Sequence, residues 1–165
     1  MMKEAMKKIL LVLAVLFAAA TTAAAGGKGD LIVVMTGFAN DSGVARVIVF
    51  DKPEGFPLDS AKALHETQAA IRNGRAVTAF KSLPFGTYAV VVLHDDDLTR
   101  NPDLNFLGVP GKAFGLSNNT HDLPAFDKSK FTLDVAHLTI EITAHYSRFT
   151  TKPRPVRPKQ SPHDQ

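Results

Sequence analysis

Cysteine and tryptophan are absent from this chain of 165 residues, and tyrosine occurs only twice. Without cysteine the chain has neither disulfides nor thiolate metal sites, so a folded domain must gain its stability from its core. A bacterial lipoprotein carries its lipid on a cysteine at the processed N-terminus, so lipid anchoring is excluded too. The length allows one domain of ordinary size.

The first 25 residues have the pattern of a cleavable signal peptide. Met1–Lys8 is basic, Ile9–Ala20 is an apolar run, and Ala23–Ala25 provides the small residues that signal peptidase recognises. A membrane-spanning helix needs about 20 apolar residues, more than this run supplies. We therefore expect cleavage after Ala25 and export to the periplasm or the medium, without a transmembrane segment after cleavage. An uncleaved N-terminal anchor is the alternative.

The other end of the chain is basic and rich in proline. Residues Lys152–Gln165 contain four prolines and four basic side chains, which predicts a disordered tail within residues 148–165. The leader carries a net charge of +2 and the tail +4, so the total of +3 leaves −3 for residues 26–147. An acidic domain of this kind does not favour nucleic acid as a partner. The tail either contacts an anionic envelope surface or is simply solvated.

Residues 26–147 have the pattern of a single all-β domain. The expected strands are Asp30–Phe38, Val44–Asp51, Arg75–Leu83, Thr87–His94, Lys130–Val135 and His137–His145. Six to seven short strands with little helix predict one β-sandwich. The nearly continuous apolar run of Thr87–His94 indicates a central strand that is buried on both faces.

Two connections are also predicted from local patterns. The polar loop between the first two strands ends in Gly43, which indicates a β-hairpin. Asp59–Arg72 has a weak apolar stripe behind a capping residue and ends at Asn73-Gly74, which predicts one short helix.

The segment Leu83–Asn119 contains an extended motif. It reads as L-P-x-G-x-Y-A, then an H-D block with alternating Asp and Asn, then G-x-P-x-x-x-x-G-x-S-N. The matching residues are Leu83, Pro84, Gly86, Tyr88, Ala89, His94, Asp95, Asp103, Asn105, Gly108, Pro110, Gly115, Ser117 and Asn118. This pattern resembles the bacterial family named domain of unknown function 2141, over roughly Leu31–Tyr146. The resemblance implies an exported sandwich of the transthyretin-like or carboxypeptidase-regulatory-like type, with no established activity.

The sequence departs from the family pattern in the acidic loop. The family's N-x-N-G positions are Asp97, Thr99 and Arg100 here, so arginine stands in place of the glycine.

Oxygen-bearing side chains in this loop predict a possible calcium site. They are Asp95, Asp97, Thr99, Asp103 and Asn105. Their odd-numbered spacing is typical of a loop that supplies oxygen ligands to Ca²⁺. Arg100 and Phe106 stand where a calcium loop usually has glycine and a bidentate glutamate, and Arg100 could neutralise the carboxylates instead. The alternative is that the carboxylates cap turns and accept hydrogen bonds from loop N–H groups.

A hydrolase that uses His94 with a loop aspartate is the alternative function. Ser117 lies in the same loop region, but a nucleophile must lie within hydrogen-bond reach of its base. No established catalytic motif is present. The structural alternative is that His94, Ser117 and Asn118 pin the loop to the strand.

The long loop is also unusually apolar. Its apolar side chains are Phe106, Leu107, Phe114, Leu116, Phe126 and Phe131. They either form a pocket for an apolar or glycan ligand or pack the loop onto the sheet edge. The sequence as a whole predicts an exported, non-catalytic module that binds a protein or glycan partner, or has a structural role, in the cell envelope.

Overall fold

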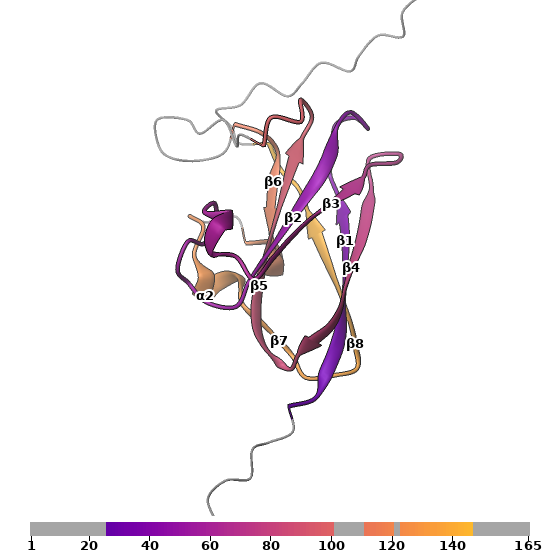
Figure 1. Ribbon diagram of the computed structural model, residues 1–165. Helices are drawn as coiled ribbons and strands as arrows, with labels where there is room; N and C mark the ends of the chain where they lie inside the picture. Colours follow the sequence, from indigo (N-terminus) through magenta and orange to yellow (C-terminus); the bar gives the residue numbers. More distant parts are fainter. Residues whose placement is uncertain (1–25, 101–110, 121–122, 147–165) are drawn as a thin grey trace, which may run out of the picture.

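The computed structural model describes residues 26–100, 111–120 and 123–146, which form a β-sandwich (Figure 1). Eight strands in two sheets make up this part of the chain, and the only α-helix there has four residues. The expected all-β sandwich is confirmed, with one or two more strands than the sequence indicated. The predicted leader and the whole of the predicted basic tail lie outside the described residues.

The first sheet has three strands and contains the N-terminal strand at its centre. Strand β1 (Lys28–Thr36) pairs antiparallel with β4 (Ala76–Pro84) and parallel with β8 (His137–Thr143). The inward-facing residues of β8, Leu138, Ile140 and Ile142, pack against the core, as expected from their alternation.

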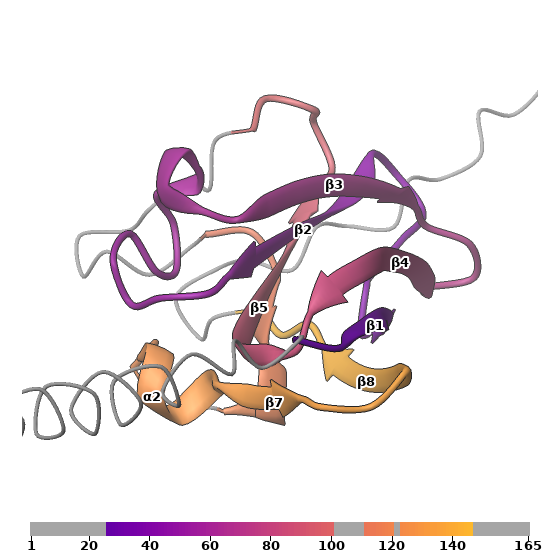
Figure 2. The same ribbon diagram turned by 60° about the horizontal axis from the view of Figure 1, so that its bottom comes forward.

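The second sheet faces the first across the core, so that the two form separate layers (Figure 2). Its order is β3 (His65–Ala70), β2 (Val44–Phe50), β5 (Gly86–Asp95) and β6 (Phe114–Leu116). The short strand β7 (Phe131–Leu133) pairs with the first residues of β5. Strand β5 is central and buried along nearly its whole length, as its apolar run predicted.

The predicted helix at Asp59–Arg72 is wrong. Only Ser60–Lys62 forms one 3-10 turn, and the residues that follow are strand β3, which pairs antiparallel with β2. The apolar stripe was weak, and a short isolated helix is marginal, so pairing with the edge of a sheet decided the structure. Among the described residues, no helix is long and apolar enough to cross a membrane.

The predicted hairpin between the first two strands is also wrong. Strands β1 and β2 lie in different sheets, and the loop between them crosses from one sheet to the other. Gly37 and Gly43 adopt left-handed backbone conformations in this loop, with φ of 86° and 66°. The glycine that suggested a hairpin turn therefore permits a crossover instead.

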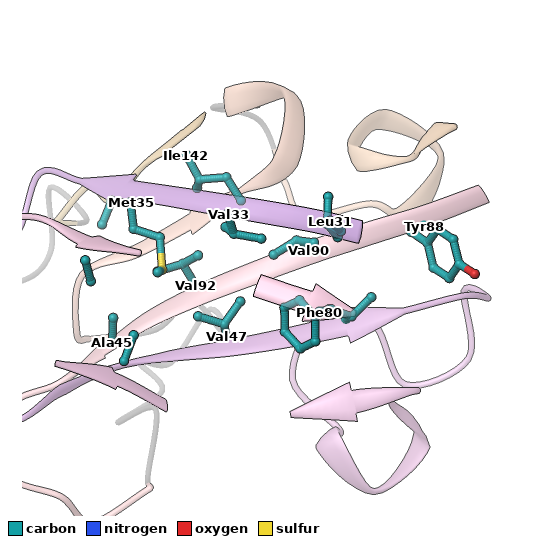
Figure 3. Packing of buried hydrophobic residues seen from close by; sticks show 14 of the residues in the cluster. Leu31, Val33, Met35, Ala45, Val47, Phe80, Tyr88, Val90, Val92 and Ile142 are labelled. Atoms are coloured by element: carbon teal, nitrogen blue, oxygen red, sulfur yellow. The ribbon is translucent and has the colours of Figure 1, made fainter. Parts of the chain in front are cut away.

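The main core fills the space between the sheets. Alternate residues of strands from both sheets meet there, and Figure 3 shows Leu31, Val33 and Met35 of β1 facing Val90 and Val92 of β5. Each of these five side chains is almost completely buried. The interior is continuous and apolar, which allows the cysteine-free domain to fold.

A second apolar cluster covers the outer face of the second sheet. Ile48, Phe50, Val91, Leu93 and Leu116 form its buried part, and partly buried aromatic side chains pack over it. The aromatic residues are Phe56, Phe114 and Phe126; Phe126 belongs to helix α2 (Phe126–Ser129). Of the apolar residues predicted for the long loop, Phe114, Leu116 and Phe126 therefore pack on this sheet face, and Phe131 packs against the main core. Phe106 and Leu107 lie outside the described residues.

Gly115 closes one side of the sandwich, where β6 approaches β8. A Cβ atom at Gly115 would lie 2.7 Å from Ile142 Cγ2 and 2.7 Å from the Thr143 carbonyl oxygen. Gly115→Ala is therefore expected to destabilise the domain by about 1–3 kcal/mol through overpacking. Gly86→Ala is the control, because a Cβ there meets only ordinary contacts at 3.6 Å or more. Chemical denaturation of both variants measures the difference, and equal stabilities would contradict this packing.

Candidate functional site

The acidic loop begins where β5 ends, at one end of the sandwich. Asp95 is the last residue of β5 and is only 2% exposed, whereas Asp97 and Thr99 lie in the exposed loop that follows. The structure brings these three of the predicted oxygen ligands together. Asp103 and Asn105, the other two, lie outside the described residues.

A lysine side chain lies between these oxygen atoms. Lys112 Nζ donates hydrogen bonds to Asp95 Oδ1 at 2.9 Å, to Thr99 Oγ1 at 3.0 Å and to Asp97 Oδ1. Lys112 is only 8% exposed, so its ammonium has left water for these partners. The positive charge that a bound metal would provide comes from the chain itself.

The pairing of β5 with β6 explains this position. The antiparallel register places Leu93 opposite Phe114, and the His94 N–H donates to the Ala113 carbonyl at 2.8 Å. Continuing this register by two residues beyond the last pair brings Lys112 to Asp95, and Lys112 Nζ bonds to its carboxylate. Directly opposed side chains of opposite charge are favourable neighbours in an antiparallel pair. Sequence reasoning missed Lys112 because the register between distant segments cannot be read from local spacing.

Hydrogen bonds from backbone N–H groups to Asp95 and Asp97 also shape the backbone of the loop. Asp95 Oδ2 accepts from the Arg100 N–H at 3.0 Å, and Asp97 Oδ1 accepts from the Thr99 N–H at 3.1 Å. Leu98 and Arg100 both have left-handed backbones, with φ of 59° and 60°. Arg100 therefore adopts, at some cost, the conformation that glycine would adopt easily at this family position. It binds the carboxylate through its backbone N–H.

A second charged pair joins this loop to the sheet. Arg46 of β2 donates to Glu66 Oε1 from Nε at 2.9 Å and from Nη2 at 2.7 Å, while its Nη1 donates to the Arg100 carbonyl at 2.8 Å. Arg46 is buried, so all these partners compensate its lost hydration. The polar contacts therefore continue from Glu66 through Arg46 and the loop backbone to Asp95 and Lys112.

The interactions in this cluster favour the charged forms of Asp97 and Lys112. Hydrogen bonds from Lys112 and then Thr99 hold the pKa of Asp97 well below its usual range. Burial lowers the pKa of Lys112, but the hydrogen bonds to Asp97 and Asp95 outweigh it and raise the pKa overall. Because the pKa of Asp97 is lower in the folded protein, this group stabilises the fold above its unfolded-state pKa of about 3.8. Because the pKa of Lys112 is higher in the folded protein, that group stabilises the fold below its unfolded-state pKa of about 10.5. The ion cluster therefore contributes fully between these two limits.

This geometry sets a condition for cation binding. The described residues contain no group of three or more His, Cys, Asp or Glu side chains arranged to hold a metal ion. Carboxylate and hydroxyl oxygens suit Ca²⁺ chemically, but they already surround an ammonium group. A calcium ion would have to displace Lys112 from Asp95, Asp97 and Thr99.

His94 connects three segments and is only 1% exposed. Its Nε2 lies 2.9 Å from the Ser42 carbonyl, which can only accept, so Nε2 carries the proton. In the neutral ring Nδ1 then accepts from the Tyr146 hydroxyl at 3.1 Å. Tyr146 Oη in turn accepts from the Ala39 N–H at 3.3 Å. Both ring nitrogens therefore tie the end of β5 to the β1–β2 loop and to the segment after β8.

Ser117 and Asn118 hold a different part of the sandwich. The Ser117 hydroxyl accepts from the Val90 N–H at 2.9 Å and donates to the Ser129 carbonyl at 2.6 Å. Val90 and His94 are four residues apart on one strand, about 13 Å, so Ser117 and His94 form no catalytic pair. Asn118 Nδ2 donates to the carbonyls of Lys128 and Lys130 at 3.1 and 3.0 Å.

We expect Lys112→Met to destabilise the domain by about 3 kcal/mol, because it leaves the buried carboxylate of Asp95 without its partner. Lys130→Met is the matched control, since Lys130 pairs at 2.6 Å with the exposed Asp127. The loss should be constant through the neutral range and shrink only below about pH 3.8, where the stabilisation from the lowered pKa of Asp97 is progressively lost. Denaturant unfolding measures both variants, and a Lys112→Met loss no larger than the control would contradict the arrangement.

Comparison with known proteins identifies the family to which the chain belongs. No curated protein and no solved structure matches the chain. The model of the family described as "Uncharacterized protein conserved in bacteria (DUF2141)" matches residues 33–141, which include β1 to β8 in whole or in part and the acidic loop. The chain therefore belongs to the DUF2141 family of uncharacterised bacterial proteins, as its motif indicated.

Proposed function

We propose that this chain is an exported, non-catalytic β-sandwich module that binds a partner or has a structural role in the cell envelope. Export is supported by the leader pattern of Met1–Ala25. The family itself has no known function.

The observation that carries the non-catalytic part is the state of His94. A general base needs a ring nitrogen within reach of a substrate proton. Both nitrogens of His94 are bonded inside the protein, to Ser42 and Tyr146, and the ring is almost completely buried. Ser117, the nearest nucleophile in the motif, is buried as well and bonded to the backbone on both sides. This geometry supports binding over hydrolysis.

The exposed loop after β5 is the surface that we propose for binding. It presents Leu98, which is 63% exposed, on a strained backbone between two residues bonded to the Lys112 cluster. Strain of this kind persists where the surroundings enforce it, often at binding sites. An apolar side chain held outward in a fixed position suits contact with a protein or glycan surface.

Cell fractionation tests this proposal. After expression of the full chain in a bacterial host, we expect an exported protein that begins at Gly26 and co-sediments with the envelope. Leu98→Ser should reduce that association, whereas Leu123→Ser, at a position 77% exposed elsewhere on the surface, should not. A cytoplasmic chain that still begins at Met1 would contradict export. If only removal of Lys152–Gln165 abolished association, the alternative of surface binding through the basic tail would replace the loop.

The oxygen atoms of this loop suit calcium chemically, but Lys112 already lies among them, so a calcium ion would compete with its ammonium group. We expect the melting temperature of wild-type Gly26–Gln165 to be the same in calcium and in chelator, because the ammonium occupies the centre of the oxygen cluster. Lys112→Ala frees these oxygens, so any stabilisation by calcium should appear in that variant. A clear calcium-dependent rise in the wild type that is lost in Asp95→Asn would instead establish metal binding with Lys112 displaced.

A further inference from the structure

The turn between β3 and β4 contains an Asn-Gly pair in a tight conformation. Arg72 and Arg75 exchange both backbone hydrogen bonds, at 2.8 and 3.1 Å, so Asn73 and Gly74 form a two-residue turn. Both have left-handed backbones, with φ of 53° and 71°. This is the geometry for which Asn-Gly is the preferred sequence.

A carboxylate from another loop holds this turn. Asp41 Oδ2 accepts from the Asn73 N–H and Asp41 Oδ1 from the Gly74 N–H, each at 2.8 Å. Asp41 lies in the β1–β2 loop, so the contact joins the loop that crosses between the sheets to the β3–β4 turn. The hydrogen bonds from Gly74 and then Asn73 also lower the pKa of Asp41, which keeps it ionised at neutral pH.

Asn-Gly pairs carry a specific chemical liability. The backbone nitrogen of the glycine attacks Cγ of the asparagine side chain, the new C–N bond closes a five-membered succinimide, and the amide nitrogen leaves as ammonia. Water then opens the ring to aspartate or isoaspartate. The attack needs the glycine nitrogen to lose its proton and to approach Cγ, and glycine permits this approach because it has no Cβ.

We propose that Asn73 is a site of spontaneous deamidation, and that Asp41 suppresses the reaction in the folded protein. The Gly74 N–H that must lose its proton and move is bonded to a carboxylate, and charge-assisted bonds of this kind are the stronger ones. The second bond, to the Asn73 N–H, fixes the backbone on the other side of the reacting amide. The reaction therefore requires this contact to open first.

Deamidation of Asn73 would change the contact with Asp41 that slows the reaction. Isoaspartate adds a main-chain carbon to a turn that has room for only two residues. Either product also places a new carboxylate beside Asp41, whose charge would repel it. Deamidation at Asn73 would therefore release the β1–β2 loop from the β3–β4 turn. This is a time-dependent change at the same end of the sandwich as His94, which also bonds to that loop.

Peptide mass spectrometry after prolonged incubation in mildly alkaline buffer tests the proposal. We expect Asn73 to deamidate slowly in the folded wild type, and at least about tenfold faster in folded Asp41→Ala, because a tenfold change corresponds to the loss of one hydrogen bond to a charged group, the one from the Gly74 N–H. Asp127→Ala, which removes an exposed carboxylate far from the turn in sequence, should behave as wild type. Wild-type protein in urea gives the unrestrained rate.

Three results would overturn the proposal. One is a folded wild type that deamidates as fast as the protein in urea. The second is an Asp41→Ala variant that reacts at the same rate as wild type. The third is an Asp41→Ala variant that reacts more slowly than wild type, which would make Asp41 a promoter of the reaction. Circular dichroism of each variant establishes that it is folded. Asn73→Asp provides a second measurement, because the added carboxylate should lower the melting temperature even if Asp41→Ala fails to fold.

Discussion

The antiparallel pairing of β5 with β6 is the constraint on which the candidate site depends. It sets Lys112 opposite Asp95, two residues beyond the paired strands, and so delivers an ammonium group to the loop that carries the other carboxylate. Because Asp95 and Lys112 are both buried, neither charge could stay there without the other. The ammonium group of Lys112 therefore fixes the shape of the loop, and the exposed residues of the loop are presented on a fixed backbone.

The remaining polar residues of the motif connect segments of the sandwich. His94 joins the end of β5 to the β1–β2 loop and to Tyr146 in the segment after β8, while Ser117 joins the middle of β5 to helix α2. Arg46 links the acidic loop to β3 through Glu66. Each of these three side chains is buried, and each would cost free energy if its partners were lost. The two residues considered for a hydrolase, His94 and Ser117, thus make bonds that fix the loops of a small cysteine-free domain.

The sequence predicted the elements whose signal is local. The apolar run of Thr87–His94 and the alternation of His137–His145 gave strands close to β5 and β8, and the clustered oxygens drew attention to the acidic loop. Features that depend on pairing between distant segments could not be predicted from the sequence. Asp59–Arg72 became a strand because β2 offered a partner, and Gly43 serves a crossover because β1 pairs with β4 and β8.

The candidate site was only partly predicted for the same reason, because pairing between distant segments cannot be read from the sequence. The spacing of Asp95, Asp97 and Thr99 is visible in the sequence, and it favours a cation among their oxygens. The identity of that cation depends on Lys112, which lies beyond a long turn-rich segment and matches no position of the motif. Arg100 was the neighbour that local spacing suggested for neutralisation; its backbone N–H bonds to Asp95 and its carbonyl accepts from Arg46.

A double-mutant cycle on Lys112 and Asp95 tests the central claim most directly. The free energies of unfolding of wild type, Lys112→Met, Asp95→Asn and the double variant give the coupling between the two side chains. We predict a coupling of about 1–3 kcal/mol, with the double variant more stable than the sum of the single losses implies, since removing both charges leaves none uncompensated. Additive losses, with a coupling near zero, would contradict the claim that this pair holds the loop.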